Sequence, residues 1–125
     1  MIYGSIEVVI QMTLKEFAAD SFLHDSFIES LNYDTTNATL TLVINFAFWM
    51  QKDYVEGEEE NGQIEVVFRN VASYECNGGD PSGDFVGILN AVADDSRLTI
   101  SLLDDENDDY VEMRISSSAV DVRKL

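Results

Sequence analysis

Apolar and polar residues alternate along most of the chain with a period of two, the spacing of side chains on a β-strand. The longest such run covers residues 38–49. Its β-branched and aromatic residues suit a pleated surface that is buried on one side. One face carries Leu40, Leu42, Ile44, Phe46 and Phe48, and the opposite face carries Thr39, Thr41 and Asn45. This run predicts the best-defined strand of the protein.

Other segments repeat the pattern over shorter lengths. Strands are predicted at residues 5–12, 63–69, 85–92, 97–103 and 109–115, with shorter ones at 71–76 and 119–124. Turn-forming or charged residues separate them at 34–37, 55–62, 77–84, 93–96 and 104–109. Turns this short favour antiparallel pairing of neighbouring strands.

One helix is predicted near the start of the chain. Thr13 and Glu16 have the spacing of a capping box, in which each side chain accepts a hydrogen bond from the other residue's backbone N–H. Leu14, Phe17 and Ala18 then form an apolar stripe at helical spacing. We expect the helix to end near residues 20–22.

The predicted elements define a fold class. The chain is long enough for one domain, which we place over residues 1–125. With so few helices, the sheet must bend on itself or pack against a second sheet. We therefore expect a mainly β protein, marginally α+β. It would be an antiparallel β-sandwich or partly open barrel of about eight strands with one short N-terminal helix covering an opening or an edge.

The charge is the most unusual property of the composition. Seven Lys and Arg residues oppose 24 Asp and Glu residues, which gives a formal net charge of −17. Hydrophobic residues make up 46%, so the chain can form a core and is not a disordered acidic segment. The negative field repels nucleic acid and anionic lipid and attracts basic proteins. The alternative is that the acidity only maintains solubility.

The cysteine content and the N-terminal sequence favour a cytoplasmic location. Cys76 is the one cysteine, so no internal disulfide can form, as is usual in a reducing compartment. The first twelve residues have no basic segment, and Glu7 interrupts their apolar run, so we expect no signal peptide. We also expect no membrane span, because no apolar stretch is long enough.

The single histidine, His24, lies beside Asp25 and between Ser21 and Ser26. One interpretation is structural: His24, Asp25 and Ser26 form a corner between the helix and the next strand, bonding free backbone groups there. The other is a small hydrolase that uses His24 with an acid and a serine. No nucleophile-elbow motif is present. We favour the structural corner, and expect no catalytic residue and no enzymatic activity.

Metal and cofactor motifs are incomplete. One His and one Cys do not make a conventional zinc site. The acidic segments starting at Asp80 and Asp104 lack the glycine and the final glutamate of an EF-hand, and weak calcium binding stays an open alternative. Gly78 and Gly83 have phosphate-loop spacing, but Asp84 stands where the lysine is required. We therefore expect no metal site and no cofactor.

Three segments carry a resemblance: residues 22–34 (FLHDSFIESLNYD), 40–46 (LTLVINF) and 64–71 (IEVVFRNV). Over residues 22–76 the chain resembles a group of small, mostly uncharacterised bacterial domains with an aromatic-hydrophobic-His-Asp-Ser corner. Some similar domains are classed as immunity proteins of toxin–antitoxin competition systems. The resemblance implies a β-rich fold and no known catalysis.

We predict a non-enzymatic, acidic protein-binding module, such as an immunity protein that neutralises a basic toxin. Two acidic loops are its predicted partner-binding sites. Trp49 and Tyr54 are the predicted aromatic anchors beside the first loop. The alternatives are core packing for Trp49, solvated surface for the acids, and a structural self-assembling subunit, so a homo-oligomer stays open. The acids are Asp53, Glu56, Glu58, Glu59 and Glu60 in the first loop, and Asp104, Asp105, Glu106, Asp108 and Asp109 in the second.

Overall fold

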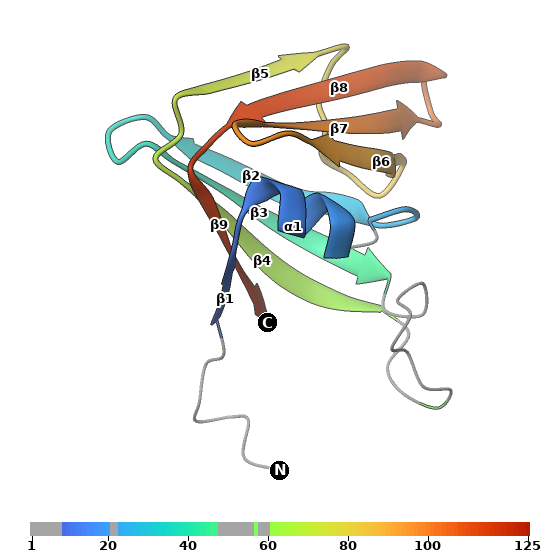
Figure 1. Ribbon diagram of the computed structural model, residues 1–125. Coiled ribbons are helices and arrows are strands. Elements are labelled where there is room, and N and C mark those ends of the chain that lie inside the picture. The colour runs from blue at the N-terminus through green and yellow to red at the C-terminus, as the bar shows by residue number, and fades with distance from the viewer. Residues whose placement is uncertain (1–8, 21–22, 48–56, 58–60) are drawn as a thin grey trace.

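The computed structural model describes residues 9–20, 23–47, 57 and 61–125 (Figure 1). These residues form nine β-strands and one α-helix. In chain order the elements are β1 (Val9–Met12), α1 (Leu14–Asp20), β2 (Phe27–Asp34), β3 (Thr39–Ala47), β4 (Asn61–Arg69), β5 (Ser73–Asn77), β6 (Val86–Ala93), β7 (Arg97–Asp104), β8 (Asp109–Ser116) and β9 (Ala119–Lys124).

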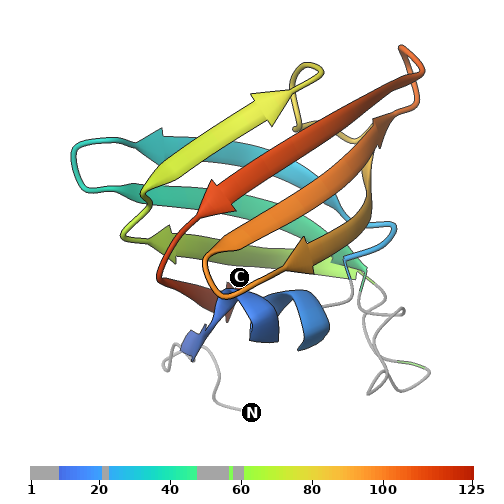
Figure 2. The same cartoon turned by 45° about the horizontal axis from the view of Figure 1, so that its top comes forward.

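All strand pairs are antiparallel, and the strands form one sheet in the order β1-β9-β4-β3-β2-β6-β7-β8-β5. β2 and β6 are joined in register only at Phe27 and Gly87. The sheet bends at this junction, so β6, β7, β8 and β5 lie as a second layer over β2, β3 and β4 (Figures 1 and 2). The predicted fold class, mainly antiparallel β with a short N-terminal helix, is confirmed.

The core lies between the two layers and follows the alternation of the sequence. Leu40, Leu42 and Ile44 of β3 are fully buried, while Thr41 and Val43 between them are only partly buried. On the other layer, β7 contributes Leu98 and Ile100 to the same cluster. Burying such side chains supplies about 1.5–3 kcal/mol each relative to leaving them exposed. The period of two is thus the direct cause of the two-layer packing.

Helix α1 begins at the predicted capping box. The Thr13 N–H donates to Glu16 Oε1 at 2.9 Å, and the Glu16 N–H donates to Thr13 Oγ1 at 3.1 Å. Buried Phe17 packs edge-to-face on Phe68 of β4, with 5.9 Å between ring centroids. The helix contacts β6 and β7 of one layer and β9 of the other, and so covers the opening between them (Figure 2). Within the described part of the chain, no helix has the length and apolarity to cross a lipid bilayer.

Candidate functional site

The His24–Ser26 corner ties the start of β2 to β6 and to the end of β3. The Asp25 N–H donates to the Ile88 carbonyl at 3.2 Å, and Ile88 donates back to the Ser26 carbonyl at 2.8 Å. His24 Nδ1 lies 3.1 Å from the Leu89 carbonyl oxygen. These contacts lie next to the single in-register pair between the layers. The corner therefore reinforces the weakest junction of the sheet.

The Ser26 hydroxyl is hydrogen-bonded to the backbone. Its oxygen accepts a hydrogen bond from the Ala47 N–H at 3.0 Å, and the residue is fully buried. A hydroxyl enclosed in this way cannot reach a substrate.

His24 and Asp25 lie close together. His24 Nε2 lies 3.6 Å from Asp25 Oδ1, with both side chains about half exposed. Asp25 has a φ of +65°, which turns the chain and lets two sequence neighbours approach each other.

The first predicted partner loop lies outside the described residues. This applies to Trp49, Asp53, Tyr54, Glu56, Glu58, Glu59 and Glu60.

The second acidic loop is the tight turn between β7 and β8, and Asp104 holds it together. Asp104 Oδ1 accepts from the backbone N–H groups of Glu106 (3.0 Å) and Asn107 (3.2 Å), and Oδ2 accepts from Asn107 Nδ2 at 2.9 Å. The hydrogen bond from the Asn107 side chain is the main reason that the pKa of Asp104 is lowered. Asp108 follows with a φ of +55°. Asp104 therefore acts as a turn cap, and the exposed Asp105, Glu106, Asp108 and Asp109 project around it.

The loop between β5 and β6 lies against this turn. The Asp105 N–H donates to the Phe85 carbonyl at 2.9 Å. Asp80 caps its own loop, since Oδ1 accepts from the Ser82 N–H at 2.9 Å and from Ser82 Oγ at 2.7 Å. These bonds, led by the one from the backbone, lower the pKa of Asp80. Between the loops is a shallow hollow of about 160 Å³, lined by Asp80, Ser82, Gly83, Phe85, Val86, Asp104, Glu106 and Asn107.

Two exposed aromatic residues accompany these acids. Phe85 is 58% exposed and Tyr110 is 73% exposed. Neither residue is among the partner-binding residues predicted from the sequence. The alternation that places Val111 inward also places Tyr110 outward, so the exposure of Tyr110 could have been predicted from the sequence. We use the name acidic end for the seven acids together with these two aromatics: Asp80, Asp84, Asp104, Asp105, Glu106, Asp108, Asp109, Phe85 and Tyr110.

A larger hollow of about 400 Å³ adjoins the acidic end on the outer face of β5, β8 and β7. Gly78 forms part of its wall with a φ of +101°. A Cβ atom at this position would lie 2.2 Å from the Tyr110 carbonyl oxygen, so only glycine fits here. The full lining is Asn77, Gly78, Ser101, Tyr110, Val111 and Glu112.

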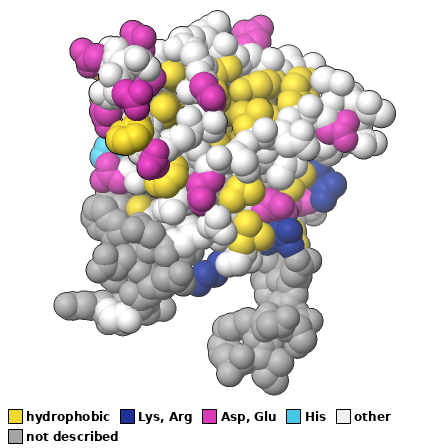
Figure 3. All heavy atoms as spheres, turned by 180° about the vertical axis from the view of Figure 1, so that it is seen from behind, with side chains coloured by type: hydrophobic (Ala, Val, Ile, Leu, Met, Phe, Trp, Pro, Cys, Tyr) yellow, Lys and Arg dark blue, Asp and Glu magenta, His cyan; other side chains and the backbone are white. Residues whose placement is uncertain are grey.

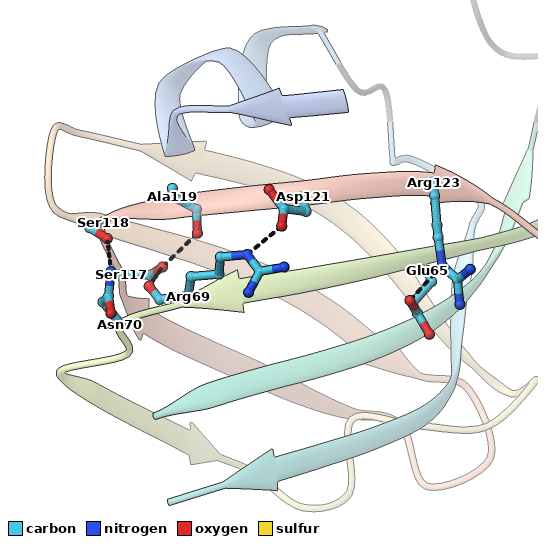
Figure 4. A network of polar contacts seen from close by, with 8 residues as sticks. All are labelled: Glu65, Arg69, Asn70, Ser117, Ser118, Ala119, Asp121 and Arg123. Carbon is cyan, nitrogen blue, oxygen red and sulfur yellow. Dashed lines mark hydrogen bonds and ion pairs between the residues drawn. The ribbon is translucent and has the colours of Figure 1, made fainter. Parts of the chain in front are cut away.

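The cationic residues are placed differently from the acids. Segments 77–86 and 104–110 contain no Lys or Arg. On the outer face of β4 and β9, Arg123 Nε pairs with Glu65 Oε1 at 2.7 Å, and Arg69 pairs with the largely buried Asp121 (Figure 4). Viewed from behind, acidic side chains gather at one end of the molecule, and the Lys and Arg side chains lie away from it (Figure 3). The arginines on the sheet are thus paired with acids, whereas the negative charge of the acidic end has no Lys or Arg in the same two segments.

Among the described residues, no group of three or more His, Cys, Asp or Glu side chains is arranged to hold a metal ion. No protein-family model matches the chain. Comparison with curated proteins and with solved structures gives no match either. The functional interpretation therefore depends on the geometry and charge of the site.

Proposed function

We propose that the protein is a non-catalytic, acidic protein-binding module that engages a basic partner through its acidic end. The observation that carries the proposal is the clustering of seven acids around exposed Phe85 and Tyr110, with no Lys or Arg in the same two segments. A finer form of the proposal is an immunity protein that neutralises a basic toxin.

The arrangement has the composition of an interface. Interface energy concentrates in a few aromatic and arginine residues surrounded by a polar rim. Phe85 and Tyr110 supply such anchors, and the acids around them supply the rim. A negative field of this kind raises the rate of encounter with a positively charged protein and disfavours anionic partners.

The acidic end is also pre-organised. Asp80 and Asp104 accept hydrogen bonds from backbone N–H groups of their own loops, and one loop is hydrogen-bonded to the other through Asp105 and Phe85. Because the loops are held before a partner arrives, binding loses less conformational entropy. Those two carboxylates shape the surface, and the neighbouring exposed acids remain available to a partner.

The proposal is tested by capture of a basic protein from the native host on the immobilised chain, followed by affinity measurement at increasing salt. We expect affinity to fall steeply with salt, because exposed charges are screened within about 8 Å at physiological ionic strength. The variant Asp105→Asn/Glu106→Gln should weaken binding. The matched control Glu29→Gln/Asp95→Asn removes the same charge outside the acidic end and should have little effect. A salt-insensitive partner, or equal effects of the two double variants, would contradict the proposal.

A further inference from the structure

The larger hollow beside the acidic end contains three polar side chains in one row. Asn77 of β5 is in register with Glu112 of β8, and Glu112 is in register with Ser101 of β7. All three line the hollow. Neighbouring strands lie about 4.8 Å apart, so the row spans about 10 Å across the sheet. Amide oxygen, carboxylate and hydroxyl are thus presented side by side on one face.

We propose that this hollow binds the guanidinium group of an arginine side chain of the partner. The inference rests on the proposed function and names the chemical group that the partner contributes. It places the contact on the face of the sheet beside the loops, not at the loop tips.

The acceptors of the row are available for an incoming donor. Glu112 Oε1 accepts from Arg114 Nε at 2.7 Å, which leaves Oε2 for another donor. Within the described residues, the side chains of Asn77 and Ser101 make no hydrogen bond. A guanidinium carries five N–H donors in a fixed plane, and several acceptors in a row match that geometry.

Tyr110 supplies the apolar side of the site. It precedes Glu112 by two residues on β8, so its side chain emerges on the same face, about 7 Å along the strand. The residue is 73% exposed. Guanidinium groups stack on aromatic rings and are attracted to their faces. Gly78 adds nothing beyond backbone to the wall, which keeps the space beside Tyr110 open.

Charge favours a cation over other ligands in this hollow. Asp108 and Asp109 immediately precede Tyr110, and the whole chain carries −17. An anionic ligand would be repelled, and a neutral one would gain nothing from the field. A guanidinium is more weakly hydrated than the ammonium group of lysine and loses less on leaving water. Arginine is therefore the side chain that fits best.

The test is a titration of the full chain with N-acetylarginine amide, followed by NMR amide shifts. The neutral isostere N-acetylcitrulline amide and the lysine analogue are the comparison probes. We expect the arginine probe to shift residues 77, 101, 110 and 112, with the citrulline probe at least about tenfold weaker, because its hydrogen bonds lack charge assistance. Equal binding of arginine and citrulline, equal binding of arginine and lysine, or no shift at these residues would overturn the inference.

Variants locate the binding. Glu112→Gln and Tyr110→Leu should each weaken the arginine probe by about tenfold. The matched controls Glu75→Gln and Phe85→Leu should leave it unchanged, because neither residue lines this hollow. Glu75 Oε2 also lies 3.8 Å from Arg114 Nη1. The Glu75→Gln control therefore shows whether a changed environment of Arg114 alone weakens binding. Controls that weaken binding as much as the hollow variants would refute the location.

The two proposals can fail separately. If the hollow variants leave capture of the basic protein intact while Asp105→Asn/Glu106→Gln abolishes it, the inference is wrong and the proposed function stands. If the arginine probe binds in the hollow but no basic protein is captured, the guanidinium site stands and the proposed function is wrong.

Discussion

Replacing Gly78 by alanine should destabilise the protein far more than the same change at its neighbour Gly79. Both glycines have positive φ, +101° and +125°, so alanine is strained at each. That strain costs about 1–2 kcal/mol. Only at position 78 does the new Cβ also meet backbone, 2.2 Å from the Tyr110 carbonyl oxygen, whereas Cβ at position 79 meets nothing within 4 Å.

The contact at Gly78 involves backbone, so relief requires β5 to move away from β8. Such displacement typically costs a further 1–3 kcal/mol or so. We expect Gly79→Ala to lose about 1–2 kcal/mol and Gly78→Ala about 2–5 kcal/mol of unfolding free energy. Urea denaturation gives both values, and the thermal midpoint should fall by about 4 °C per kcal/mol. Equal losses in the two variants would refute the close approach of Gly78 to Tyr110.

Three other predictions concern the corner and the turns. Ser26→Ala should cost about 1–3 kcal/mol in urea denaturation, because it removes the buried hydroxyl that accepts a hydrogen bond from the Ala47 N–H. No loss of stability would contradict a contribution from this bond. His24→Ala should lower the melting temperature through loss of its contact with β6, and an unchanged melting temperature would disprove a structural role. Asp34 and Asp104 have lowered pKa values, through bonds from Asn37 and Asn107 respectively. Their stabilisation should be complete above the unfolded pKa of about 4 and should disappear as pH falls through the lower folded pKa. Urea denaturation at neutral and acid pH measures this, and Asp104→Asn should reduce the difference.

The sequence predicts local features well, because each depends on residues close together in the chain. Alternation identified β3 and β7 to within a residue or two, and the Thr13–Glu16 capping box is present as expected. The irregular strand β2 was harder to define, because a bulge between Ile28 and Ser30 breaks the period of two. About eight strands were expected, and the described residues form nine.

The candidate site depends on contacts that alternation does not encode. The loops at 78–85 and 105–108 are far apart in sequence, and the hydrogen bond from Asp105 to Phe85 brings them together. Charge composition indicated an acidic surface but not that Asp80 and Asp104 cap their own loops. The row of Asn77, Glu112 and Ser101 requires the register of three strands, and two of them, β5 and β8, are not consecutive in the chain.

The single in-register pair between β2 and β6 has a consequence for how the molecule assembles. On each side of that pair, strands such as β2 with β3 and β7 with β8 join through short turns and need only small loops to close. Pairing of this kind forms quickly, whereas β2 and β6 are more than fifty residues apart and lose more chain entropy on meeting. The chain-consecutive groups β2–β3–β4 and β6–β7–β8 are therefore expected to form first. The pairings that close late are β2 with β6, β4 with β9, and β1 with β9, because their partners lie fifty or more residues apart.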